Sequence, residues 1–273
     1  MAKDSRNSKT TANRYFRIIE EIFLSHFRQG TEQFTFSRDE IMQVAKKLGI
    51  KLPKNLGDVI YSFRYRVQLP HSVREKAPPG KVWIIQPAGQ AKYRFVATTV
   101  STISPSINLA ETKVPDATPG IIAMYALSDE QALLAKLRYN RLLDIFTGVA
   151  CYSLQNHLRT SVKGVGQLET DEVNIGVDKR GAHYVFPVQA KGHKDKISVV
   201  QIEQDIAMCA AKFPHLICRP VAAQFMSEDL IALFEFEKGH SGITVCSEKH
   251  YRLVEPDKIQ IEDLEAYRRR QLE

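Results

Sequence analysis

The sequence predicts an α/β (α+β) protein in two parts, a basic helical domain followed by a larger domain with a mixed sheet flanked by helices. Three observations predict this. The 273 residues are enough for two separate cores. Residues 1–100 carry 18 Lys and Arg against 8 Asp and Glu (net +10), and the remainder carries 20 against 23 (net −3). Apolar residues recur at helical spacing early in the chain, and form strand-length runs later.

Composition narrows the class of protein. The hydrophobic content of 44% and charged content of 25% are ordinary for a soluble globular chain. No apolar run approaches the roughly 18 residues of a membrane helix, and the polar start MAKDSRNSKTTANR lacks the apolar stretch of a secretory signal. We therefore expect no membrane association and a cytoplasmic location. The four cysteines lack zinc-site spacing and are expected to be buried, reduced thiols: Cys151, Cys209, Cys218 and Cys246.

The N-terminal domain is expected over residues 13–98, after a disordered basic tail at 1–12. A first helix runs from Asn13 toward Gly30. The capping-box pair Ser37 and Glu40 begins a second helix. A third helix is indicated by four apolar residues at i, i+3, i+4 and i+7, which are Leu56, Val59, Ile60 and Phe63. The runs 81–85 and 92–98 then predict a hairpin.

Three helices followed by a hairpin resemble a winged-helix domain. The resemblance implies that the third helix enters the DNA major groove. The polar residues of this helix are of types that bond bases and phosphates, so we expect them to bind DNA: Lys54, Asn55, Tyr61, Arg64 and Arg66. The alternatives are a winged helix used for protein contacts and an ordinary solvated helix face.

Residues 99–127 are interpreted as a connector, with at most one short strand, and residues 128–273 as the second domain. A capping-box pattern at Ser128 begins a long amphipathic helix reaching Phe146, and residues 150–162 are expected to form another helix. Further strands of the sheet are predicted by three apolar runs, 217–225, 230–237 and 242–248. The charged C-terminus predicts a last helix.

Two strands joined by a turn at 179–181 are predicted between residues 162 and 217, at 168–177 and 183–191. A helix is predicted after them, at 198–213. Glu169 and Asp171 share one strand parity, and Gln189 and Lys191 share the parity of the next strand. A hairpin would bring these four side chains together. Hard cations such as Mg²⁺ prefer oxygen ligands of this kind, and a nearby lysine can position the water that attacks a phosphodiester.

The pattern resembles the PD-(D/E)XK nuclease superfamily, in which an acid on one strand precedes acid-x-Lys on the next. Asp171 fits the first acid, and Gln189-Ala190-Lys191 fits the second element with Gln in place of the acid. The resemblance implies a bound Mg²⁺ held by Asp171 with Gln189 or Glu169. Because Gln189 brings no charge, Glu169 or Glu203 of the following helix would supply the missing carboxylate.

The predicted function is a type II restriction endonuclease that cuts double-stranded DNA as a homodimer, within a restriction-modification pair. Arg159 and Lys163, which precede the first of these strands, are expected to hold the DNA backbone. One alternative is a repair or junction-resolving nuclease with the same core. Another is a non-catalytic winged-helix regulator, in which the charged residues are exposed groups on an ordinary hairpin.

Overall fold

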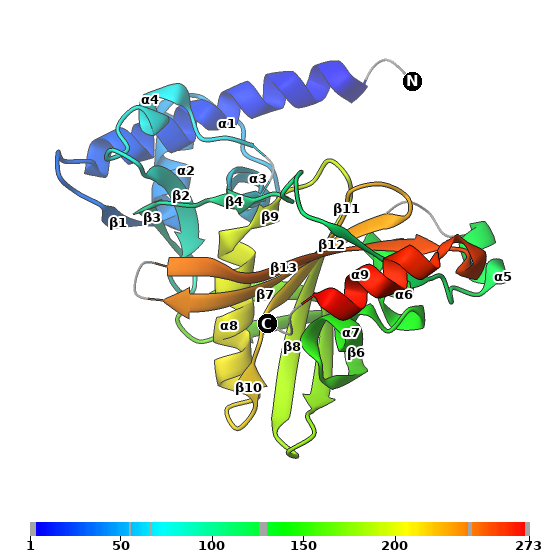
Figure 1. The fold of residues 1–273 in the computed structure, drawn as a ribbon. Coiled ribbons are helices and arrows are strands. Elements are labelled where there is room, and N and C mark those ends of the chain that lie inside the picture. The colour runs from blue at the N-terminus through cyan, green and yellow to red at the C-terminus, as the bar shows by residue number, and fades with distance from the viewer. Residues whose placement is uncertain (1–3, 55, 66, 126–129, 240–241, 271–273) are drawn as a thin grey trace. The chain divides into compact units, whose positions relative to one another are not determined.

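The computed structural model describes residues 4–54, 56–65, 67–125, 130–239 and 242–270, which form helices and sheets of a mixed α+β protein (Figure 1). The chain divides into two compact units, each with its own hydrophobic core. The first comprises residues 1–102 with the short segments 161–168 and 198–200, and the second comprises the rest.

The first unit combines helices with a small antiparallel sheet of strand order β1-β3-β2. The three helices and the hairpin that the sequence predicts are present, with an additional strand at 33–37. The elements are α1 (Asp4–His26), β1 (Gln33–Ser37), α2 (Arg38–Lys47), α3 (Gly57–Tyr65), α4 (His71–Arg74), β2 (Val82–Pro87) and β3 (Lys92–Thr98).

Residues 4–12 are helical, so the expectation of a disordered tail over residues 1–12 is wrong for them, and residues 1–3 lie outside the described part. No Pro or Gly interrupts 4–26, and α1 extends upstream from its buried residues Ile18, Ile19, Ile22 and Phe23. The capping box before α2 is confirmed: Glu40 N–H donates to Ser37 Oγ, and Ser37 N–H donates to Glu40 Oε1.

The second unit is built on a sheet that has eight strands in the described residues. Its order is β5-β13-β12-β11-β8-β7-β6, with β10 beside β8. Its strands are β5 (Glu111–Pro115), β6 (Ala150–Val162), β7 (Gly166–Val177), β8 (His183–Lys191), β10 (Ile217–Cys218), β11 (Val221–Phe225), β12 (Leu230–Gly239) and β13 (Gly242–Val254). Two short strands, β4 (Thr102–Ile103) and β9 (Ile197–Ser198), form a separate two-stranded sheet. The helices are α5 (Gly120–Tyr125), α6 (Glu130–Tyr139), α7 (Leu142–Thr147), α8 (Val199–Lys212), the 3₁₀ turn η1 (Pro256–Lys258) and α9 (Ile261–Arg269).

The sheet is mixed. β8 runs antiparallel to β7 but parallel to β11, and α8 lies between β8 and β11 in the chain. Side chains of β8 alternate between its faces. Tyr184, Phe186 and Val188 pack in one core with the leucines of α6 and α7, whereas Gln189 bonds Asp205 of α8. The two helical layers therefore cover opposite faces of β8 (Figure 1).

The expected helix at 150–162 is wrong, because these residues form strand β6 at the sheet edge next to β7. Most side chains of β6 are exposed, so the strand lacks the alternation that reveals a half-buried strand, and Leu154 and Leu158 fall at helical spacing. Pairing with β7 decides the conformation.

The single long helix expected up to Phe146 is also wrong. It breaks into α6 and α7 at Arg141, whose φ of +52° is left-handed. The capping residue expected at Ser128 lies outside the described residues. The connector at 99–127 contains β4, β5 and α5, and β5 extends the large sheet beside β13.

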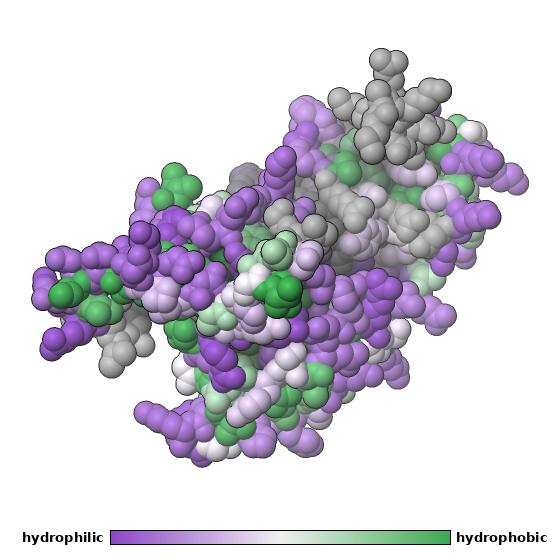
Figure 2. Space-filling view, turned by 90° about the vertical axis from the view of Figure 1, so that its right-hand side faces the viewer, coloured by the Kyte–Doolittle hydropathy of each residue, from purple (hydrophilic) through white to green (hydrophobic). Residues whose placement is uncertain are grey.

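All four cysteines are free, but only Cys151 and Cys209 are buried; Cys218 is half-buried and Cys246 is exposed, against expectation. The face of the molecule shown in Figure 2 is mostly hydrophilic, and its hydrophobic residues form small separate groups. Among the described helices, none has the length and apolar character needed to cross a membrane.

Candidate functional site

Lys191 lies between two carboxylates near the end of β8. Its Nζ is 3.6 Å from Glu130 Oε1 and 3.8 Å from Asp171 Oδ2, and its side chain is only 9% exposed. The backbone N–H of Ala190 donates to Asp171 Oδ2 at 2.8 Å, which fixes that carboxylate beside the strand. The structure thus brings Asp171 and Lys191 together from adjacent antiparallel strands, as the sequence predicts.

Glu130 was not among the expected site residues. It is the first residue of α6 and is half-exposed. Burial raises the pKa of its carboxyl; Lys191 lowers it in part, and the charges of Asp171 and Asp195 raise it further. Glu130 comes from α6 and Asp171 from β7, so only the folded chain reveals that Glu130 joins Asp171 beside Lys191.

Gln189 lies two residues before Lys191 on β8, but among the described residues its side chain bonds groups other than Asp171 and Lys191. One of these groups, the Asp205 carboxyl, interacts electrostatically with both Asp171 and Lys191. Gln189 is 1% exposed. Its Nε2 donates to Asp205 Oδ2 at 2.9 Å and to the Glu169 carbonyl at 3.4 Å, and its Oε1 accepts from Gln201 Nε2 at 3.2 Å. Both ends of the amide are therefore occupied by α8 and β7, and Gln189 joins α8 to the sheet.

Glu169 also lies apart from the pair. Its carboxylate contacts Arg159 Nε at 3.1 Å and His157 Nδ1 at 3.5 Å, both on β6, and is 41% exposed. The regular pairing of β7 with β8 ends at Glu172 opposite Val188, and Thr170 bonds Asp205 of α8, so strand parity does not predict the surroundings of Glu169. Arg159 and Lys163 are exposed, and Arg159 forms an ion pair with Glu169.

Asp205 of α8 accepts a hydrogen bond from Gln189. Glu203, the residue of α8 that was expected to supply the missing carboxylate, is half-buried. Asp205 is fully buried and accepts a hydrogen bond from Thr170 Oγ1 at 2.5 Å. Burial raises the pKa of Asp205 to about 7, although the bonds from Thr170 and Gln189 lower it. The sequence signal for this residue is the position of Asp205 on the face of α8 that also carries the buried residues Ile202 and Met208.

The raised pKa of Asp205 predicts a pH-dependent stability. In the folded protein the carboxyl holds its proton up to about pH 7, whereas an unfolded aspartate loses it near pH 4. The resulting stabilisation is complete below about pH 4 and is lost as the pH rises through about 7. We expect Asp205→Asn, which cannot ionise, to gain stability relative to the wild type as the pH rises from 5 to 8.

Urea unfolding midpoints of both proteins at each pH measure this difference, with Asp257→Asn at an exposed position as the control. Parallel pH profiles for Asp205→Asn and the wild type would contradict the assignment.

The residues expected to bind DNA lie in the first unit. Lys54 is exposed, Tyr61 is 46% exposed and Arg64 is half-buried. Asn55 and Arg66 lie outside the described residues. Lys54, which precedes α3, and Tyr61 on α3 are therefore the members of the expected set that are exposed to solvent among the described residues.

The predicted chemistry implies a bound metal ion. Within the described residues, no group of three or more His, Cys, Asp or Glu side chains is placed to hold one. Two carboxylates, Glu130 and Asp171, approach a common cation, the Lys191 ammonium. Mg²⁺ is commonly held by one or two carboxylates, with waters and phosphate oxygens completing its shell. The pair therefore fits Mg²⁺ bound together with substrate better than a preformed protein cage.

Comparisons of the chain with protein family models, curated proteins and solved structures returned no match.

Proposed function

We propose that this chain is a Mg²⁺-dependent nuclease that cuts DNA through a site formed by Asp171, Glu130 and Lys191. The observation that carries the proposal is the position of the Lys191 ammonium, which lies within 4 Å of both carboxylates. The order of acid on β7, lysine on the neighbouring β8 and a following helix α8 supports a PD-(D/E)XK core. Gln189 is the departure from that pattern.

In the proposed reaction Asp171 and Glu130 would hold the metal ion. When bound, Mg²⁺ neutralises charge on the phosphodiester and makes water a better nucleophile. Asp171 is oriented for this by the Ala190 N–H, so little reorganisation is needed. Lys191 donates hydrogen bonds to the attacking water or to the phosphate oxygens, and its near-complete burial keeps its ammonium at that position.

The remaining parts of the proposal concern the substrate. A winged-helix interpretation of the first unit is supported by helices α1 to α3, the β2–β3 hairpin and the net charge of +10 over residues 1–100. Cutting both strands of a duplex requires two sites, which a homodimer on a palindromic sequence supplies. We therefore propose a type II restriction endonuclease, with a branched-DNA nuclease as the alternative.

Nicking of supercoiled plasmid tests the proposal. We expect the wild type to nick it with Mg²⁺ but not with EDTA, and Asp171→Asn to lose at least about 100-fold in rate, because the variant lacks a charged ligand. Asp257→Asn, at an exposed position of the 3₁₀ turn, should match the wild type. Full nicking by Asp171→Asn would overturn the assigned site.

DNA binding by the first unit predicts a separate result. Lys54→Ala should weaken binding to all DNA sequences alike and reduce the slope of log affinity against log salt by about 1, because one phosphate contact is lost. Lys258→Ala in η1 is the matched control and should leave the slope unchanged. Fluorescence anisotropy at several salt concentrations measures both, and equal slopes for Lys54→Ala and the wild type would contradict the DNA-contact role.

A second function is favoured by one observation. The Gln189 amide is directed to Asp205 and not to the Asp171 pair, so the second acidic position of the motif supplies no ligand. A DNA-binding regulator without cleavage would accommodate that arrangement. Salt-sensitive DNA binding with no Mg²⁺-dependent nicking would favour it.

A further inference from the structure

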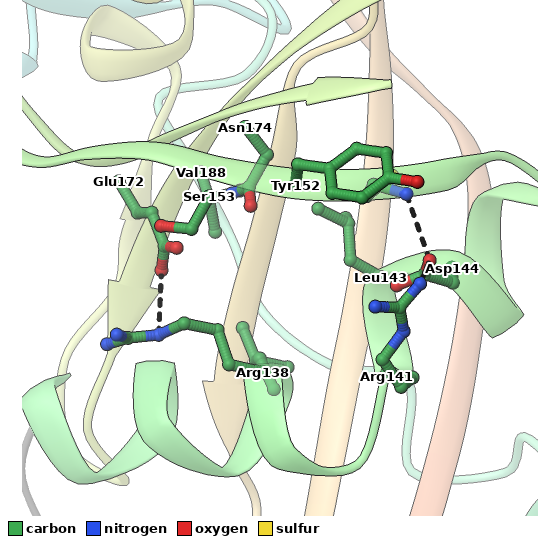
Figure 3. A pocket seen from close by; sticks show the side chains of 11 residues that line it. Arg138, Arg141, Leu143, Asp144, Tyr152, Ser153, Glu172, Asn174 and Val188 are labelled. Atoms are coloured by element: carbon green, nitrogen blue, oxygen red, sulfur yellow. Dashed lines mark hydrogen bonds and ion pairs between the residues drawn. The ribbon is translucent and has the colours of Figure 1, made fainter. Parts of the chain in front are cut away.

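A cavity of about 280 Å³ lies between the α6–α7 segment and strands β6, β7 and β8 of the second unit. Its apolar lining comes from Leu137, Leu143 and Val188. Its polar lining comes from the arginines of α6 and the following turn, from Asp144 of α7, from Tyr152 and Ser153 of β6, and from Glu172 and Asn174 of β7 (Figure 3). The proposed nuclease reaction uses none of these residues.

Glu172 is the unusual member of the lining. It is 1% exposed, and its Oε2 lies 3.6 Å from the Nε of Arg138. Its other oxygen, Oε1, is buried and has no hydrogen-bond partner among the described residues. A buried carboxylate oxygen without a donor is costly, because the water it loses on folding is not replaced. In Figure 3 the Glu172 carboxylate points toward Arg138 and the space beside it. A ligand with N–H donors would satisfy Oε1.

The other polar groups restrict that ligand. Asn174 is 6% exposed and offers both an amide donor and an acceptor. Arg141 has a left-handed backbone and pairs with Asp144, which in turn accepts the Cys151 N–H at 2.9 Å. A simple anion would meet Glu172, and a simple cation would meet the two arginines. A neutral group with both donors and acceptors on its edge suits the mixed lining.

We propose that this cavity binds a nucleobase. A base combines flat apolar faces, which fit Leu143 and Val188, with a hydrogen-bonding edge for Glu172 and Asn174. Tyr152 at the rim is 62% exposed and can stack on a base or its neighbour. Guanine fits best, because its adjacent N1–H and N2–H donors match a carboxylate and its O6 accepts from an amide or guanidinium.

The cavity is close to the proposed cleavage site along the chain. Glu172 follows Asp171 on β7, and Arg138 lies eight residues after Glu130 on α6, about 12 Å along the helix. The base could belong to a free nucleotide or to a DNA strand near the cut. Base binding does not require cleavage, so this inference stands or fails separately from the nuclease proposal.

Calorimetry with the full chain in EDTA tests it, using dGMP, dAMP, dCMP and dTMP as probes. We expect dGMP to bind at least tenfold more tightly than dTMP, whose single N–H lies between two carbonyls. Glu172→Gln should weaken dGMP binding at least tenfold. Tyr152→Ala, at the exposed rim where folding is not at risk, should weaken it severalfold. Tyr139→Ala on α6, 45% exposed and outside the cavity, should not.

The source of the base is distinguished by pentathymidylate and the same strand with one central guanine. Glu172-dependent binding of dGMP indicates a nucleotide site. Glu172-dependent preference for the guanine-containing strand, without dGMP binding, indicates a base presented by DNA. Binding of neither probe, or binding that both Glu172→Gln and Tyr152→Ala leave unchanged, overturns the proposal.

Discussion

Lys191→Ala is expected to lower the rate of DNA cleavage by about 10²–10⁴-fold, the range typical of a lost proton-transfer or water-positioning group. The ammonium is the only group that we place within 4 Å of both Glu130 and Asp171 among the described residues. Without it, nothing at that position orients the water or the phosphate. A gel assay of plasmid nicking under single-turnover conditions measures the loss.

Two controls separate this effect from misfolding and from weaker DNA binding. Lys194→Ala removes an exposed lysine three residues away and should cut at the wild-type rate. The affinity of Lys191→Ala for DNA in EDTA should stay within about twofold of the wild type, because basic residues elsewhere supply most of the attraction. Cleavage by Lys191→Ala at the wild-type rate would contradict the catalytic assignment.

Phe23→Ala is expected to produce the largest loss of stability in the first unit, about 3–5 kcal/mol in the free energy of unfolding. Phe23 is fully buried in α1. Its ring centroid lies 5.1 Å from those of Trp83 and Phe95 and 5.2 Å from that of Phe27, so one side chain joins α1 to both β2 and β3. Its removal leaves a cavity at the centre of that aromatic cluster.

Urea denaturation followed by the fluorescence of Trp83, the one tryptophan in the chain, reports on this unit directly. Leu24→Ala is the matched control, because the neighbouring Leu24 is 43% exposed and should cost less than about 1 kcal/mol. A loss for Phe23→Ala no larger than that for Leu24→Ala would contradict the description of this core.

The sequence predicted the elements whose patterns are strong. β8, α8 and the capping box of α2 were found within one or two residues, because a continuous apolar run, an amphipathic repeat and paired caps are local signals. β6 was taken for a helix because an edge strand with exposed faces carries no such signal, and its partner β7 decides its conformation.

The candidate site was predicted in part for the same reason. Asp171 and Lys191 lie on strands that are adjacent in sequence, so a hairpin was enough to bring them together. Glu130 and Asp205 reach the neighbourhood from helices 41 residues before and 14 residues after that pair, and their placement depends on how α6 and α8 pack on the sheet. The sequence could not show that the Gln189 amide bonds Asp205 and Gln201, because these partners come from α8 and are chosen by the burial of the amide in the folded chain.

Cleavage of unmethylated phage DNA by the purified wild-type chain, with Mg²⁺ and with EDTA, resolved on a gel, tests whether the protein is a nuclease. We predict Mg²⁺-dependent cleavage that disappears in Lys191→Ala, and discrete fragments whose ends map to one short sequence. Intact DNA at every Mg²⁺ concentration, together with retained salt-sensitive binding, would contradict the nuclease assignment and support the regulator.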